Sequence, residues 1–339
     1  MSHIGEQSTV SATVHQWRHL SHRYQVGWDE TILIALNIHG LHSHGHEGET
    51  VRLRVQPPQT EVFQLVVPAG RPTSPFTVTE GDLRVDGTPV ARVVDLRSDN
   101  SVSGYLRGGG RAATIHPRKT DDPQFSDQDG YTRLLADLAI SLPQGRTLPD
   151  LDEVTVSAAN YPDEATAMRD LATLRTAMTS LDMTARIGLL SSVVTSAEAF
   201  TELSRSVAPF TLFLDTDAQP DDSPMQPAEV LAAARGAGHE ASFTYTVGKE
   251  PLDDMRDRLL PLAQYTTVWP SLNILQAPSP EDDAPHIAEP AERLDYFLQA
   301  RAMVERIFAP TDLIPQPWRC YRGLWYREHA TRPLPGPWI

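Results

Sequence analysis

Carboxylates and a histidine in the middle and second half of the chain have types and spacing suited to chemistry. Asp215 and Asp217 directly follow the apolar run 210–214. Two carboxylates at positions i and i+2 of an extended chain point the same way, which suits a shared cation or a sugar diol equally. With Glu250 and His116 they are candidates for acid–base or metal-assisted catalysis on a polar substrate.

Small and polar residues stand at the ends of other short apolar runs. If those runs are parallel strands, their carboxyl ends meet at one edge, where small polar groups can bind a ligand without filling its cavity. Strand ends are also polar simply because they meet solvent, so both interpretations stay open. The candidate binding residues from this pattern are Asn160, Ser191, Asp215, Asp217, Gly248 and Gln276.

Seven of the twelve histidines fall between His15 and His46. His42, His44 and His46 alternate, so on an extended segment they would project to one side and could bind Zn²⁺, Ni²⁺ or Fe²⁺ through neutral imidazole. A solvated, histidine-rich loop is the alternative. Earlier in the chain, His15, His19 and His22 have the spacing of one helix face.

The chain has one cysteine, Cys320, which we expect to be a packed thiol. Disulfides, cysteine-based zinc sites and iron–sulfur clusters held within one chain all need more thiols. The net charge is −15, from 29 Lys and Arg against 44 Asp and Glu, a sign that repels nucleic acid and anionic lipid. No apolar stretch approaches the length of a membrane span, so we expect a cytoplasmic protein whose partners are small molecules or other proteins.

Up to about residue 96 the pattern is typical of strands. The runs 32–36, 51–55 and 62–67 are short and apolar or alternating, and 83–85 and 90–94 flank the turn pair Asp86-Gly87. We predict a small β-rich N-terminal domain over 1–106. Four glycines within 100–111 indicate a crossover loop to the next domain.

Beyond residue 131, helices and strands are predicted to alternate. About five consecutive βα units without a glycine-rich dinucleotide turn favour a partial or full β/α (TIM-like) barrel over a doubly wound sheet. We therefore predict an α/β fold with a barrel over 107–309, wrapped by a Pro- and Trp-rich segment, 310–339. Its aromatic residues are expected to plug one barrel end: Trp318, Tyr321, Trp325 and Tyr326. The expected strands are 154–156, 187–190, 210–214, 242–247 and 271–275, and the expected helices are 163–180, 196–206, 227–237, 253–263 and 293–308.

The segment Phe-Thr-Tyr-Thr-Val-Gly-Lys-Glu-Pro-Leu-Asp-Asp at 243–254 resembles the late-barrel segment of radical S-adenosylmethionine enzymes, in which a strand ends in glycine, an acidic residue follows and a helix starts. The βα units before it and the segments 271–276 and 318–326 also resemble that superfamily, over roughly 107–326. The resemblance implies that Asp215 and Asp217 contact the ribose of S-adenosylmethionine and that Val247 and Gly248 lie near its adenine.

The sequence departs from that family where the family binds its cluster. Members hold a [4Fe-4S] cluster with three closely spaced cysteines after the first barrel strand, and the equivalent loop here, placed at 111–125, has none. Ala158-Ala159-Asn160 stands in place of the amine-binding Gly-Gly-Glu. We expect a barrel of bacterial specialised metabolism that binds S-adenosylmethionine or another polar small molecule without a cluster or radical chemistry. The alternatives are a cluster-independent acid–base enzyme, with or without metal assistance, and a non-catalytic partner of a biosynthetic enzyme.

Overall fold

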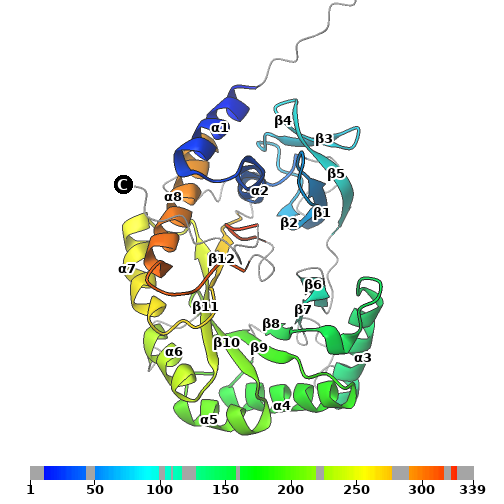
Figure 1. The fold of residues 1–339 in the computed structure, drawn as a ribbon, viewed down its shortest axis with the longest axis vertical. Coiled ribbons are helices and arrows are strands. Elements are labelled where there is room, and N and C mark those ends of the chain that lie inside the picture. Colours follow the sequence, from blue (N-terminus) through cyan, green and yellow to red (C-terminus); the bar gives the residue numbers. More distant parts are fainter. Residues whose placement is uncertain are drawn as a thin grey trace, which may run out of the picture.

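The computed structural model describes residues 11–42, 50–98, 104–107, 110–116, 127–157, 161–218, 225–276, 290–316 and 322–326. These residues form two β-sheets and a set of helices (Figure 1). Several residues singled out from the sequence lie outside the described ranges: His44, His46, Asn160, Trp318, Cys320 and Tyr321.

The N-terminal sheet has five antiparallel strands in the order β2-β1-β5-β4-β3. It confirms the four strands predicted at 51–55, 62–67, 83–85 and 90–94. The predicted hairpin is also confirmed, because Asp86 and Gly87 join β4 to β5 with φ of 45° and 81°, the left-handed values of such turns. The strands are β1 (Thr50–Gln56), β2 (Phe63–Pro68), β3 (Phe76–Thr79), β4 (Asp82–Val85) and β5 (Thr88–Ser98).

The strand predicted at 32–36 is wrong, because this run lies in helix α2 (Trp28–His39). Every residue from Asp29 to Ile38 is buried, so α2 has no polar face and its sequence shows no helical period. Helix α1 (Ala12–Tyr24) precedes it and confirms the helical spacing of the early histidines, whose side chains are exposed. The N-terminal region therefore combines a sheet with two helices.

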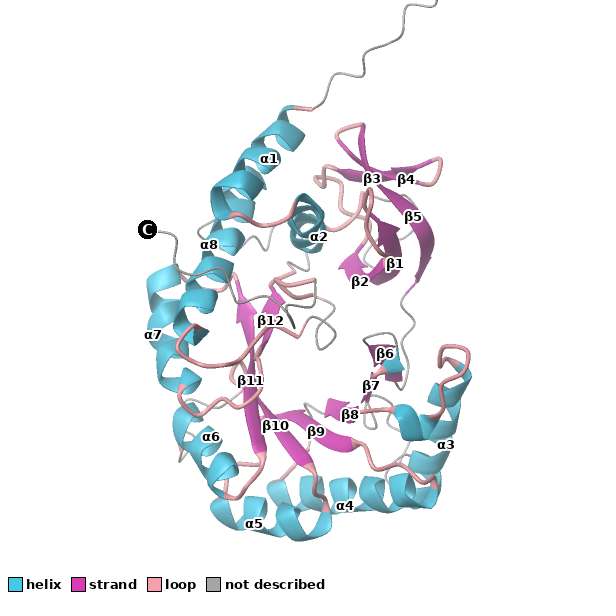
Figure 2. Cartoon of the chain, viewed as in Figure 1, coloured by secondary structure: helices cyan, strands magenta, loops and turns pink. Residues whose placement is uncertain are grey.

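The second sheet is a curled half-barrel of seven strands in the order β12-β11-β10-β9-β8-β7-β6 (Figure 2). Strands β7 to β12 are parallel neighbours in chain order, and β6 is antiparallel to β7. The crossover loop expected over 100–111 instead contains strand β6, and the loop placed at 111–125 begins with strand β7. The strands are β6 (Gly104–Arg107), β7 (Ala112–Ile115), β8 (Glu153–Ser157), β9 (Arg186–Ser191), β10 (Phe210–Asp215), β11 (Glu240–Val247) and β12 (Ser271–Ile274).

A helix follows each parallel strand, and these helices cover the convex side of the sheet (Figures 1 and 2). The predicted α/β class and the predicted helices are confirmed, and the open strand order makes the barrel partial. Asp127, Asp163 and Ser196 cap three helix starts with their side chains. The helices are α3 (Gln128–Ile140), α4 (Glu164–Ser180), α5 (Ala197–Ser206), α6 (Pro227–Gly236), α7 (Leu252–Ala263) and α8 (Pro290–Phe308), with a 3₁₀ turn at Leu148–Asp150.

Helix α8 joins the half-barrel to the N-terminal helices, since it packs against α7, α1 and α2. The later residues 322–326 add to this junction: Gly323 bridges Asn273 of β12, and Trp325 stacks edge-on against Trp269 at 5.1 Å. Trp325 and Tyr326 are buried at this junction. No helix within the described ranges is long and apolar enough to cross a membrane.

Candidate functional site

The concave face of the half-barrel is mostly polar because its strands alternate, with Leu190 and Phe213 as a paired apolar exception. Val154, Val156, Leu212 and Leu214 belong to the apolar set, and Phe243 of the same face contacts Phe308 of α8, which places this set on the convex side. The residues between them therefore face the concave side. In neighbouring strands they align as Thr114 with Thr155, Thr155 with Gly188, Gly188 with Thr211, Asp215 with Thr244, and Thr246 with Asn273.

The amino-terminal half of this face is a buried, hydrogen-bonded floor. Arg107 of β6 donates through Nη2 to Thr155 Oγ1 at 2.8 Å and to Glu153 Oε1 at 3.3 Å, and Thr155 donates to the same Glu153 oxygen at 2.7 Å. Further along the face, Thr211 donates to Glu240. A buried ion pair is tolerated when hydrogen bonds of this kind accompany it, and here Arg107, Thr155 and Glu153 bond to one another. The alternating sequence of β8 was the signal for this network, which the strand-end reasoning missed.

The carboxyl-terminal half of the same face forms a more exposed rim. Side chains from every parallel strand or the turn after it reach this rim, and each is half-buried or exposed, unlike the floor residues. We define the rim by His116, Ser157, Ser192, Asp215, Asp217, Thr246, Lys249 and Asn273. The carboxyl end of a parallel β/α sheet is where ligand sites occur in this architecture.

The two candidate aspartates lie together on the rim. Asp217 binds Lys249 Nζ at 3.0 Å through Oδ1 and accepts the Thr246 backbone N–H at 2.9 Å through Oδ2. Asp215 accepts the Asp217 backbone N–H at 3.1 Å. Burial raises the pKa of the Asp215 carboxyl, opposed by the backbone N–H of Asp217. The rim thus holds two acidic groups of different character, one paired with a lysine and one partly desolvated.

His116 and Ser192 complete the other side of the rim. His116 Nδ1 lies 3.3 Å from the backbone oxygen of Ser157, and its ring lies 5.6 Å from that of Tyr105 in β6. Ser192 donates to the backbone oxygen of Ala218 at 3.2 Å, which ties the turns after β9 and β10 together. Ser191, the residue singled out from the sequence, belongs to the opposite face, where its hydroxyl accepts the Val193 N–H.

Glu250 is separated from the two aspartates by the sheet. Its carboxylate accepts the hydroxyl of Tyr245, a convex-side residue, and pairs with Arg258 of α7 at 3.0 Å, while Tyr296 of α8 donates to its backbone oxygen at 2.6 Å. Burial, followed by the charge of Glu250, raises the pKa of Tyr296 to about 12. These contacts fix the turn between β11 and α7 against the helices.

Val247, Gly248 and Gln276 have backbone or linking contacts. The Val247 backbone oxygen accepts the Leu275 N–H at 2.9 Å. Gly248 has φ +114°, a backbone conformation that residues with a side chain rarely adopt. Gln276 donates to Asn37 of α2 at 3.0 Å and to the Val66 oxygen of β2 at 3.2 Å. Gln276 therefore connects the end of β12 to the N-terminal region.

The structure describes only His42 of the predicted metal-binding trio, and its backbone N–H bonds to Phe76. Within the described ranges, no group of three His, Cys, Asp or Glu side chains is arranged to hold a metal ion. In comparisons with known proteins, no family model matches this sequence and no curated protein resembles it significantly. The rim itself offers carboxylates, hydroxyls and one ammonium group along a curved edge.

Proposed function

We propose that the rim of the half-barrel binds a polar, hydroxyl-bearing small molecule with a positive charge, and that S-adenosylmethionine is the first candidate. The observation that carries this proposal is the change along one face, from a buried floor whose side chains bond to one another to a rim of partly exposed acidic and hydroxyl groups. Ligand sites of this kind combine a few placed polar groups with a preformed scaffold.

Charge favours a cationic ligand. Asp215 and Asp217 contribute two carboxylates, and Lys249 is the one lysine or arginine among the rim residues. A ligand hydroxyl pair or ammonium group can replace the lysine on Asp217, because the Lys249 side chain is 46% exposed and can move into solvent. S-adenosylmethionine supplies both a ribose diol and cationic groups.

The donor set does not fit the [4Fe-4S] cluster that the family resemblance would imply. Such clusters are held by several cysteine thiolates, and Cys320 is the only cysteine in the sequence. The proposed function is therefore binding, with no step that passes through a cluster.

The test is a titration of the full chain with S-adenosylmethionine and S-adenosylhomocysteine, followed by calorimetry and thermal unfolding. A ligand at 100 times its Kd stabilises the folded state by about 2.7 kcal/mol, which a thermal shift resolves. We expect Asp217→Asn to weaken S-adenosylmethionine binding about tenfold, because it removes one charge-assisted contact.

Asp257→Asn is the matched control, since Asp257 is a 70% exposed carboxylate on α7, also paired with a cation. It should leave the titration unchanged. Absence of binding by either ligand, or equal losses in the two variants, would contradict the proposal. So would 5′-deoxyadenosine formed from S-adenosylmethionine by the same sample under reducing conditions.

A further inference from the structure

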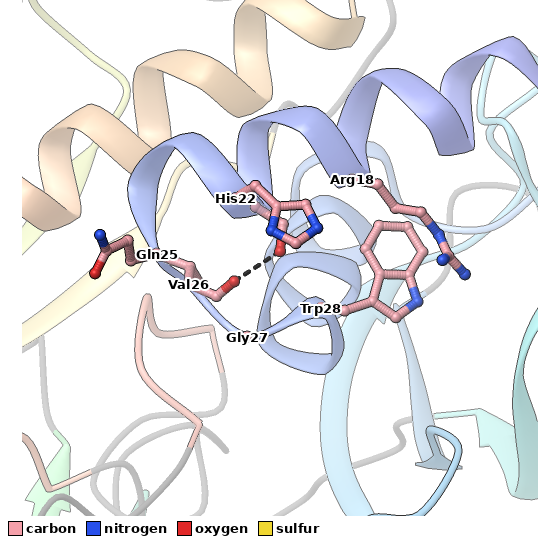
Figure 3. Close-up of a pocket in the computed structure, with 7 residues that line it drawn as sticks. Arg18, His22, Gln25, Val26, Gly27 and Trp28 are labelled. Carbon is pink, nitrogen blue, oxygen red and sulfur yellow. Dashed lines mark hydrogen bonds between the residues drawn. The ribbon is translucent and has the colours of Figure 1, made fainter.

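A surface hollow of about 600 Å³ lies at the corner between α1 and α2, outside the half-barrel. Its volume is in the range of small-molecule sites. Figure 3 shows side chains of α1 and of the start of α2 around it. The lining residues are Arg18, Ser21, His22, Gln25, Val26, Gly27 and Trp28.

Two basic side chains of this hollow are available to a ligand. Arg18 and His22 are spaced i and i+4 on the exposed side of α1, so they are neighbours on the helix surface. Neither side chain makes a hydrogen bond or ion pair with any residue in the described ranges. Helix α1 contains no acidic residue, although the whole chain has a net charge of −15.

The Arg18 side chain is held in place by stacking. Its guanidinium carbon lies 5.0 Å from the centroid of the Trp28 ring. Stacking occupies the flat face of a guanidinium and leaves its in-plane N–H groups for a planar, two-oxygen acceptor. A carboxylate matches that edge. In the view of Figure 3 the Trp28 ring lies between this guanidinium and the His22 imidazole, so the primary contact is with Arg18.

The other lining residues indicate what kind of group must be attached to the carboxylate of the ligand. Trp28 and Val26 contribute apolar surface, and the Ser21 hydroxyl already donates to the Val26 oxygen at 2.7 Å. The start of α2 gives no added anion site, since Asp29 already places a carboxylate beside Gly27. The hollow therefore suits a ligand with one anionic end and an apolar body.

We propose that this hollow is a second binding site, independent of the rim, for a small organic carboxylate. Arg18 binds the carboxylate with two parallel hydrogen bonds, and the apolar body packs against Trp28 and Val26. Because the contacts are partly exposed to solvent, the affinity is modest and falls with added salt.

The test uses benzoate as the probe, measured by calorimetry and saturation-transfer NMR on the full chain at low salt. We expect a Kd on the order of 1 mM, and at least about tenfold weaker binding by the Arg18→Gln variant, since it loses the paired, charge-assisted bonds. Benzamide, which has the same ring without the charge, should bind at least about tenfold more weakly than benzoate.

Arg205→Gln is the matched control, because Arg205 is a 72% exposed arginine on another helix, α5. It should bind benzoate as the unmodified chain does. Equal binding by the Arg18→Gln variant, equal binding of benzamide, or tighter binding of inorganic phosphate than of benzoate would each overturn the proposal. S-adenosylmethionine binding at the rim should be the same in the Arg18→Gln variant, so this test and that of the proposed function fail separately.

Discussion

Asp215 is a partly desolvated carboxyl group on the rim. Burial raises its pKa above the ordinary value of 3.8, and the N–H of Asp217 opposes this only in part. A folded-state pKa above the unfolded value means that the native chain binds the proton more tightly, so stability falls as pH rises through that window.

We therefore predict that Asp215→Asn is more stable than the unmodified chain at pH 7. Asparagine keeps an oxygen for the Asp217 N–H and removes the partly desolvated charge. Solvent screening at this half-exposed site limits the gain to less than about 1 kcal/mol. Urea unfolding at pH 7 and at pH 3 measures it: the gain should be present at pH 7 and absent at pH 3. A gain that is the same at both pH values would show that the charge of Asp215 is not its cause.

At the scale of elements, the turn between β11 and α7 depends on a glycine for two reasons. Gly248 has φ +114°, and a Cβ there would lie 3.0 Å from Leu275 Cβ and from Phe297 Cζ. Gly248→Ala combines backbone strain with overpacking, so we expect a loss of about 1–3 kcal/mol in the free energy of unfolding.

Gly236→Ala is the control for this prediction, because it lies in helix α6 and a Cβ there would meet nothing within 4 Å. Alanine is the better helix former, so this variant should be unchanged or slightly more stable. Chemical unfolding of both variants gives the comparison. A Gly248→Ala protein as stable as the Gly236→Ala protein would show that the turn relaxes at no cost.

The βα units could be predicted from the sequence because each has a local signal. Helix α4 has Leu171 and Leu174 on one apolar face after its cap, Asp163, and strands such as β10 are short apolar runs between turns. Helix α2 lacked such a signal, since the same apolar run fits a buried strand or a helix buried on all sides. Strand β6 is only four residues long, begins with Gly104 and is followed by three glycines at 108–110, so its pairing with β7 is its main determinant.

The candidate site was predictable only in part, for a related reason. The rule that ligands bind at strand ends depends only on the order of helices and strands, and it pointed to Asp215 and Asp217. The sheet face of each residue follows from alternation once the strand bounds are known. A shift of one residue along the strand moves a side chain to the other face, which is why Ser191 was predicted and Ser192 lies on the rim. The contact of Gln276 with Asn37 joins residues 239 positions apart, and no local pattern reports it.

At the scale of the whole molecule, a buried ion cluster connects three distant segments. Arg301 of α8 contacts Glu30 of α2 at 3.1 Å and Glu305 at 3.1 Å, and donates to the Leu324 oxygen at 2.8 Å. Glu305 also accepts the Trp325 indole N–H, at 2.9 Å. Burial lowers the pKa of Arg301, but the charges of Glu30 and Glu305 outweigh it and raise the pKa overall.

We predict that Arg301→Met lowers the free energy of unfolding by about 3–5 kcal/mol, because it leaves two buried carboxylates without their cation. Arg306→Met, at an exposed position on the same helix, should change it by no more than about 0.5 kcal/mol. Urea unfolding followed by far-UV and near-UV circular dichroism tests both. Since the cluster joins α2 to α8 and to residues 322–326, we expect the unmodified chain to unfold in one transition seen equally by both probes. Two separated transitions, or equal stability of the two methionine variants, would mean that the N-terminal region and the half-barrel fold without support from this junction.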